Sequence, residues 1–466
     1  MSVLRRALAA LRHVGLLAVA GGAANAANVI VTVIIARLLT TREYGGVAQL
    51  VGVFVVLSMP GSALLVGVVR RVTALEAAGR HAELEEWVRE ARRRTAFGLG
   101  VFAVAAVALR WVIASALGLP GPSGVAEVLI AGGGWTALSV ERGLLQSRQA
   151  YALLARNLAV EGAARTVVTL LLVASGAGIE GTALGLLAAM AGCVVDARRS
   201  LTRVVQPVAA DPAAVEDVAR APIPAPESLP AESLPLESLL AESLPAGTPP
   251  GAVPRLGADL AVAVAALGLL AVLQYTDVVV VGRLDPGAAG SYAAISVACK
   301  ALVFGAVVLS GYLLPEAVWR WHHGRHALGP LSMAVGILAV PAVGLIAVAV
   351  AAPKVLLRLV FGPKLVSAAP AFGALAVAMA ALAVSVLLTN YLLGIGRRAV
   401  VPVLLVAAVG IAAVIGRGTG TPQSIAHVEL AGQLGLCAVL TAMVLMISRR
   451  GPVAQGTTAP KNVRNA

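Results

Sequence analysis

Long apolar runs separated by short polar turns extend along almost the whole chain. An α-helix needs about 20 apolar residues to cross the hydrocarbon core of a bilayer, and the runs are close to that length. The pattern therefore predicts twelve membrane-spanning helices. They are expected at residues 14–36, 47–69, 95–117, 124–146, 158–177, 179–197, 256–282, 288–313, 330–352, 366–393, 398–416 and 425–447.

The composition also indicates a membrane protein. Of the 466 residues, 59% are hydrophobic and 13% are charged, with a mean hydropathy of +0.89. Ordinary soluble domains are roughly 45–50% apolar and about 25% charged. Aromatic residues make up only 4%, so small and aliphatic residues supply the hydrophobicity, which favours closely packed helices over a barrel. We expect an all-α polytopic membrane protein.

The basic residues cluster at the ends of the apolar runs and predict the orientation. With both termini in the cytoplasm, 26 of the 36 lysines and arginines fall in cytoplasmic segments and seven in outer turns, as the positive-inside rule requires. The net charge of +13 is therefore assigned to topology and not to nucleic-acid binding. The first apolar run is 23 residues long, too long for a typical signal-peptide core, and predicts a retained helix.

A polar segment at residues 198–255 divides the chain. It contains four ESLPA-like repeats, in which proline blocks a continuous helix and large apolar residues are too few to form a core. We interpret it as a disordered cytoplasmic linker, with an acidic docking segment as the alternative. The predicted organisation is a six-helix bundle at 1–197, this linker, a second six-helix bundle at 256–448 and a cytoplasmic tail at 449–466.

The two predicted bundles share a sequence pattern. The stretch IIARLLTTREYGGVAQL in the first half resembles VVGRLDPGAAGSYAAIS in the second. Aligning Arg37 with Arg283 brings Tyr44 near Tyr292, and in each half a long apolar run and a basic cluster follow. Because six helices is an even number, both halves enter the membrane from the same side. We therefore expect parallel repeats related by an axis along the membrane normal, an arrangement known among secondary transporters.

Several stretches resemble polysaccharide exporters of the Wzx type in the multidrug/oligosaccharidyl-lipid/polysaccharide (MOP) superfamily. The stretch ARLLTTREYGGVAQL looks like their first periplasmic turn. LQYTDVVVVGRLDPGAAGSYAAISVACKAL, which contains Asp277 and Lys300, is similar to their seventh and eighth helices. VFGPKLVSAAPAFGAL and GAGIEGTALGLLAA resemble later turns. The resemblance covers most of residues 14–415, fails in the segment 198–255, and has Leu365 where the family often has tyrosine.

Such flippases move an undecaprenyl-diphosphate-linked sugar unit from the inner to the outer leaflet of the bacterial inner membrane. The resemblance therefore implies a MATE-like fold, in which two pseudo-symmetric six-helix bundles give alternating access to a lipid-linked anionic oligosaccharide. It implies no cofactor, no metal and no covalent chemistry. Membrane lipids, a coupling ion such as H⁺ or Na⁺, and polysaccharide polymerase or glycosyltransferases are the partners it suggests.

Lys300 is the most informative ionisable residue. A charge at the centre of a bilayer costs about 2.5–3.5 kcal/mol on insertion scales and normally faces a cavity or a partner. Lys300 lies 12 residues into its predicted span, about 18 Å along the helix. We expect it either in a central cavity, where it would contact the diphosphate or an acidic sugar, or in a buried ion pair with Asp277. Asp277 is also a candidate site for a coupling ion.

Glu161 and Arg165 lie four residues apart in the fifth predicted span, with the glutamate first, which is the favourable order for an intrahelical pair. Their alternatives are an ion-coupling site at Glu161 and a substrate contact at Arg165. Asn25 and Asn28 in the first predicted span could bind sugar hydroxyls, or hold helices together by hydrogen bonds.

Arg70 and Arg142 lie near the predicted cytoplasmic ends of their spans. They are candidates for receiving the substrate headgroup, although such positions more often serve as topology signals. The segment 82–94, AELEEWVREARRR, begins with acidic residues and ends with basic ones, as the helix dipole favours. It predicts a cytoplasmic helix that could lie on anionic lipid.

Three other functional classes remain to be weighed. A membrane enzyme is disfavoured because the predicted outer turns are short and contain no carboxylate pair or His/Asp cluster. The chain has no Walker loop, and its three cysteines lie inside apolar runs without metal-ligand or disulfide spacing. A cation-coupled multidrug exporter of the same superfamily is the main alternative, and a lipid-binding scaffold without transport is the third.

Overall fold

The computed structural model describes residues 27–205, 253–322, 328–418 and 420–449. Most of the predicted linker, nearly all of the predicted tail, and Asn25 lie outside these residues. Every regular element in the described part is helical. The helices are a first one at Ala27–Leu38, followed by α2 (Thr41–Ala77), α3 (His81–Leu117), α4 (Val125–Ser147), α5 (Tyr151–Ala174), α6 (Gly178–Val205), α9 (Val253–Leu284), α10 (Ala289–His322), α11 (Leu328–Ala351), α12 (Pro353–Val360), α13 (Phe372–Gly394), α14 (Val400–Gly416) and α15 (Pro422–Arg449), with short 3₁₀ turns at Pro363–Leu365 and Ala369–Ala371.

Each of the twelve predicted spans overlaps one helix of the structure, the first of them over its described residues 27–36. Nine helices in the described residues are long and apolar enough to cross a membrane, and Ala27–Leu38 and α14 are shorter apolar helices. The remaining one, α4, is 23 residues long and carries charged side chains at Glu127, Glu141 and Arg142. The helix predicted at 82–94 is present, and it is continuous with the following span in the 37-residue helix α3.

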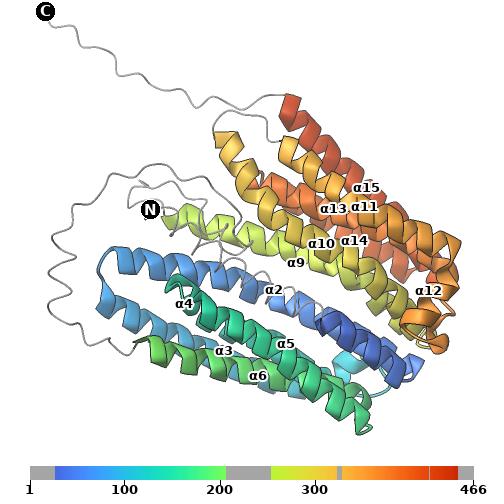
Figure 1. The fold of residues 1–466 in the computed structure, drawn as a ribbon, viewed down its shortest axis with the longest axis horizontal. Coiled ribbons are helices and arrows are strands. Elements are labelled where there is room, and N and C mark those ends of the chain that lie inside the picture. Colours follow the sequence, from blue (N-terminus) through green and yellow to red (C-terminus); the bar gives the residue numbers. More distant parts are fainter. Residues whose placement is uncertain (1–26, 206–252, 323–327, 419, 450–466) are drawn as a thin grey trace, which may run out of the picture.

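The helices form two bundles with the same internal packing. Figure 1 shows α2 to α6 together on one side and α9 to α15 on the other. In the N-terminal bundle α2, α3 and α6 pack on α4, and α5 packs on α6. In the C-terminal bundle α10, α11 and α15 pack on α13, and α14 packs on α15. This correspondence confirms the predicted fold class of two pseudo-symmetric six-helix bundles.

The repeated polar turns begin the second helix of each bundle. At the first turn Thr40 caps α2: its hydroxyl accepts from the Glu43 backbone N–H (3.3 Å), and the Glu43 carboxylate accepts from the Thr40 N–H (2.9 Å). This is a capping box, which fixes the start of a helix. At the second turn the Asp285 side chain accepts from the Ala288 N–H (3.1 Å), just before α10 begins. A side chain of the turn thus accepts a backbone hydrogen bond in both repeats, and in the first it caps the helix.

The two bundles meet along what we call the outer seam: residues 37–49 of the first bundle against residues 279–290 and 359–364 of the second. The Arg37 guanidinium donates to the carbonyl of Val360 (3.0 Å) and to that of Leu359. The buried Gln49 amide donates to the Val279 carbonyl (3.3 Å) across the seam. Apolar residues at 31–47 also belong to the buried core of the C-terminal bundle. The first helix and the start of α2 thus tie the two halves together.

Two glycines permit this close approach. A Cβ atom on Gly290 of α10 would lie 2.0 Å from the carbonyl oxygen of Thr41. A Cβ atom on Gly45 of α2 would lie 2.6 Å from the Cβ of Ala289. Contacts this short are excluded, so the backbones of α2 and α10 can touch only because both positions lack a side chain.

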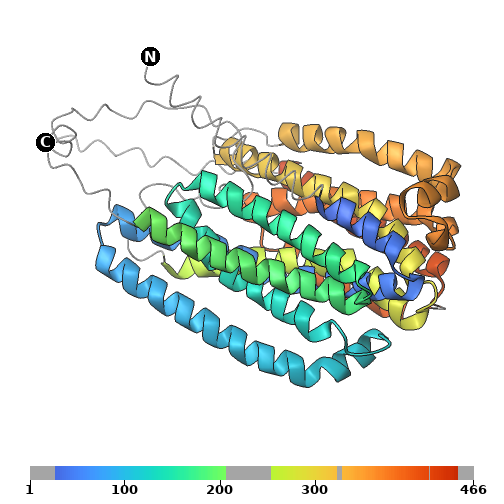
Figure 2. The ribbon, with the colours of Figure 1, turned by 60° about the horizontal axis from the view of Figure 1, so that its bottom comes forward.

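The outer seam lies at one end of the molecule. The connection from α2 to α3 and the last turn of α15 lie at the end opposite to α12 (Figures 1 and 2). Among the described residues, the hydrogen bonds between the halves come from Arg37, Thr41 and Gln49, all in the seam. The two bundles are therefore joined at the end predicted to face outward.

Candidate functional site

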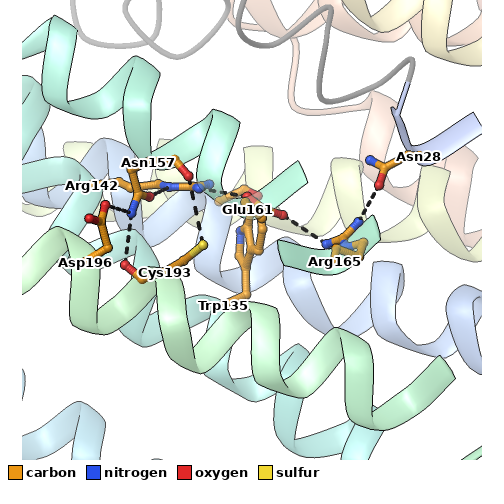
Figure 3. Close-up of polar contacts among 9 residues, drawn as sticks. Asn28, Trp135, Arg142, Asn157, Glu161, Arg165, Cys193 and Asp196 are labelled. Carbon is orange, nitrogen blue, oxygen red and sulfur yellow. Dashed lines mark hydrogen bonds and ion pairs between the residues drawn. The ribbon is translucent and has the colours of Figure 1, made fainter. Parts of the chain in front are cut away.

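Glu161 of α5 is the centre of a buried polar network in the N-terminal bundle (Figure 3). Its carboxylate accepts from Arg165 Nη2 at 2.9 Å, which confirms the predicted intrahelical pair. The other carboxylate oxygen accepts from Arg142 Nη2 on α4 at 2.7 Å. Two guanidiniums therefore share one carboxylate, an arrangement that the sequence did not predict.

The network extends from both arginines. Arg165 Nη1 donates to the side-chain oxygen of Asn28 (3.1 Å), which brings the first helix into the network. Arg142 Nε donates to Asn157 Oδ1 (2.9 Å), and the Asn157 amide donates in turn to Asp196 Oδ2 on α6 (3.0 Å). Four helices thus contribute to one chain of hydrogen bonds, drawn in Figure 3. Of the predicted site residues, Asn28, Arg142, Glu161 and Arg165 lie in it.

Aromatic rings flank the two guanidiniums. The Arg142 guanidinium carbon lies 5.5 Å from the centre of the Trp135 ring, and that of Arg165 lies 5.8 Å from the centre of the Phe54 ring. Cations at such distances are attracted by the ring quadrupole. The two arginines carry two positive charges against the single negative charge of Glu161. The centre of the network is therefore positive by one charge, and Arg165, at 19% exposure, is its more accessible cation.

The two arginines predicted at span ends lie within their helices. Arg142 is buried, and α4 continues beyond it to Ser147. Its ion-pair partner is Glu161 on α5. Arg70 is half-buried on α2, which continues to Ala77.

A second charge cluster lies in the C-terminal bundle. Lys300 Nζ on α10 lies 3.5 Å from Asp277 Oδ1 on α9 and 4.1 Å from the centre of the Tyr275 ring. The Lys300 side chain is 3% exposed, and Asp277 is fully buried. Ser296 donates to the second oxygen of Asp277 at 3.1 Å. Of the two alternatives for Lys300, the structure shows the ion pair with Asp277. The ammonium lies between this carboxylate and the Tyr275 ring.

Glu429 of α15 joins this cluster, and the sequence analysis missed it. Its side chain is fully buried, accepts from Gln433 Nε2 at 2.8 Å, and lies close enough to Asp277 and Lys300 to interact electrostatically with both. Glu429 Oε2 and Asp277 Oδ1 accept no hydrogen bond among the described residues. One ammonium therefore interacts with two acidic side chains. A signal was present in the sequence, because Glu429 and Gln433 lie four residues apart in a predicted span.

Both clusters border the same helix, α2. Tyr275, over which Lys300 lies, packs against Gly52, where an added Cβ would be 2.9 Å from its ring. Phe54, two residues further along α2, is the ring beside Arg165. The charged clusters of the two bundles are thus separated by one helix, which also forms part of the outer seam.

No protein-family model and no curated protein matches the sequence. Solved structures do match its fold. One is a multidrug resistance MATE family transporter of the MOP superfamily in an inward-facing conformation, with 12% sequence identity, 91% of this chain and 94% of that chain covered, and a TM-score of 0.67. A MATE family transporter of the same description in an outward-facing conformation has 12% identity, coverage of 95% and 96%, and a TM-score of 0.55.

The lipid II flippase MurJ in an inward closed conformation is also similar, with 9% identity, 93% of this chain and 92% of that chain covered, and a TM-score of 0.59. At such low identity the likeness concerns the fold. It agrees with the all-helical architecture and with the repeated packing of the two bundles. The chain therefore has the fold of the MOP-superfamily transporters.

Proposed function

We propose that this protein is a membrane transporter that flips an undecaprenyl-diphosphate-linked oligosaccharide from the inner to the outer leaflet. The observation that carries the proposal is the pair of guanidiniums on Glu161. Because Arg142 and Arg165 share one carboxylate, the network has unmatched positive charge. A diphosphate is the kind of group that guanidiniums bind through paired, charge-assisted hydrogen bonds.

In the proposed transport cycle, the outer seam closes and opens in turn. With the seam closed, the headgroup enters from the predicted cytoplasmic side and contacts Arg165, while its lipid tail stays in the bilayer. Opening of the seam and approach of the opposite ends of the bundles then exposes the headgroup to the outer side. An inside-negative potential favours outward movement of an anion by about 2.3 kcal/mol per charge per 100 mV.

The C-terminal cluster is the proposed site of ion coupling. When both carboxyls are ionised, Asp277 and Glu429 together exceed the charge of Lys300 by one. Binding of one H⁺ or Na⁺ makes the cluster neutral, and release makes it negative again. Asp277 keeps the role that the sequence suggested, Glu429 joins it, and Glu161 is assigned to holding the two arginines. Polysaccharide polymerase or glycosyltransferases remain proposed partners.

A cation-coupled multidrug exporter is the second candidate. The buried carboxylates of the C-terminal bundle favour it, since they could bind a coupling ion or a cationic drug. The N-terminal network opposes it, because a cationic drug would be repelled by Arg165 and Arg142. The two functions therefore differ in the charge of the substrate.

The substrate class can be tested in proteoliposomes. We expect the purified protein to move a polyprenyl-diphosphate-linked oligosaccharide across the bilayer, measured by the access of an external lectin to its sugar. Ethidium serves as the cationic probe in the same vesicles under a proton or sodium gradient. Transport of ethidium without movement of the lipid-linked sugar would refute the flippase function and establish the exporter. Protein-free vesicles provide the baseline for both probes.

A further inference from the structure

An apolar groove on the N-terminal bundle lies outside both charge clusters. Its volume is about 510 Å³, within the range of about 300–1,000 Å³ typical of small-molecule sites. It lies between α3 and α6 and over α4, on which both of those helices pack. Its lining is almost entirely aliphatic and includes Leu99, Ile130, Leu187, Met190 and Val194.

One end of the groove carries three charged side chains. Glu141 of α4 is fully buried and accepts from Arg92 Nε on α3 (3.0 Å) and from Arg198 Nε on α6 (2.8 Å). A guanidinium has five N–H donors, so each arginine keeps donors that Glu141 does not use. The side chains of Arg92 and Arg198 are 35% and 48% exposed. The groove therefore ends at two accessible guanidiniums with a net charge of +1.

The apolar walls and the charged end of the groove indicate the kind of ligand that fits it. Apolar walls offer water no hydrogen-bond partners, and an unfilled groove would lose the dispersion contacts of its lining atoms. An acyl chain supplies those contacts, and a phosphate supplies acceptors for the guanidiniums. Basic pockets between membrane helices on the cytoplasmic side are recurrent sites for anionic lipid headgroups, and this end of the groove is on the predicted cytoplasmic side.

We propose that the groove binds an anionic glycerophospholipid of the cytoplasmic leaflet. One acyl chain lies between α3 and α6, and the phosphate lies between Arg92 and Arg198. The binding site is separate from the Glu161 network, so it does not depend on the substrate proposed above. Charge complementarity at the groove end selects phosphatidylglycerol over the zwitterionic phosphatidylcholine.

Native mass spectrometry of the full-length protein measures this binding directly. The protein is purified in detergent and titrated with phosphatidylglycerol or phosphatidylcholine. One substitution tests the apolar groove and one tests its charged end, and each has a matched control. Ala191→Trp fills the groove from an exposed position in its lining, and Ala188→Trp places the same bulk on an exposed part of α6 outside it. Arg198→Gln removes one phosphate ligand while Arg92 continues to pair with Glu141, and Arg199→Gln is its exposed neighbour outside the groove.

We expect the wild-type protein to retain one phosphatidylglycerol more strongly than any phosphatidylcholine. Arg198→Gln should weaken that retention about tenfold, as expected for the loss of one charge-assisted contact, and Ala191→Trp should abolish it. The variants Ala188→Trp and Arg199→Gln should behave like the wild type. Equal retention of the two lipids, or full retention in Ala191→Trp, would overturn the proposal, as would the finding that the retained molecule is a polyprenyl phosphate. Thermal unfolding of each sample shows that the variants are folded.

Discussion

Glu161→Ala is expected to lower the free energy of unfolding by about 3–5 kcal/mol, the cost typical of removing one partner from a buried ion pair. The substitution leaves Arg142 and Arg165 inside the bundle with no carboxylate between them. Their mutual repulsion adds to the cost of the unpaired charges. The measurement is the midpoint of thermal unfolding of the purified protein in detergent, together with its level in the membrane.

Two comparisons make this prediction specific. Glu90→Ala removes a carboxylate that also pairs with two arginines, Arg93 and Arg94, but at the exposed part of α3, and we expect little change there because surface pairs contribute little. The double variant Glu161→Ala/Arg165→Ala should recover part of the lost stability, since one unpaired charge is gone. An unfolding midpoint unchanged by Glu161→Ala would show that this network does not stabilise the bundle.

Lys300→Ala is expected to stop export of the lipid-linked sugar and to destabilise the C-terminal bundle by a similar amount, about 3–5 kcal/mol. Without the ammonium, Asp277 and Glu429 face each other as two buried carboxylates. Export is measured as surface polysaccharide on cells in which this protein is the sole exporter, normalised to its membrane level. Full export at a normal membrane level would remove Lys300 from the mechanism.

The double variant Lys300→Ala/Asp277→Asn separates a structural role from a transport role. Removing both charges of the pair should restore part of the stability, because the repulsion between Asp277 and Glu429 is gone and only Glu429 is left without the ammonium. Export should stay low, because the site can no longer change its charge during the cycle. Restored export in the double variant would mean that the pair serves folding alone.

The sequence predicted the number and order of the spans because bilayer thickness sets the length of each apolar run. The boundaries were less predictable. The helix α3 begins at His81, well before the predicted residue 95, because helical structure continues from the membrane into the aqueous region while hydrophobicity does not. The repeated turns were also visible, since aligning Arg37 with Arg283 brings Tyr44 near Tyr292.

The partners of the buried charges were only partly predictable. The pair Glu161–Arg165 follows from spacing within one helix, whereas the contact from Arg142 depends on how α4 packs in the bundle. Glu429 was overlooked because it lies near the start of its span, where a charge usually marks the interface. Whether a polar residue at the end of a span is exposed to water or buried depends on how the neighbouring helices pack, which the sequence alone does not give.

The central claim is that the structure is one end of an alternating-access cycle, closed at the outer seam. Gly290→Ala tests it, because the new Cβ would lie 2.0 Å from the Thr41 carbonyl oxygen and must push α10 away from the start of α2. Gly336→Ala is the control, since nothing lies within 4 Å of that position. Spin labels at Arg71 on α2 and Ser332 on α11, both exposed, report the distance between the opposite ends of the bundles.

The labels are placed in protein without the three native cysteines, Cys193, Cys299 and Cys437, and the distance distribution is measured by pulsed electron paramagnetic resonance. We expect a long distance between the two labels in the wild type and in Gly336→Ala. In Gly290→Ala the new methyl group should open the outer seam, so the opposite ends of the bundles approach and the distance between the labels becomes shorter. The same distribution in all three proteins, with each of them folded, would contradict the account.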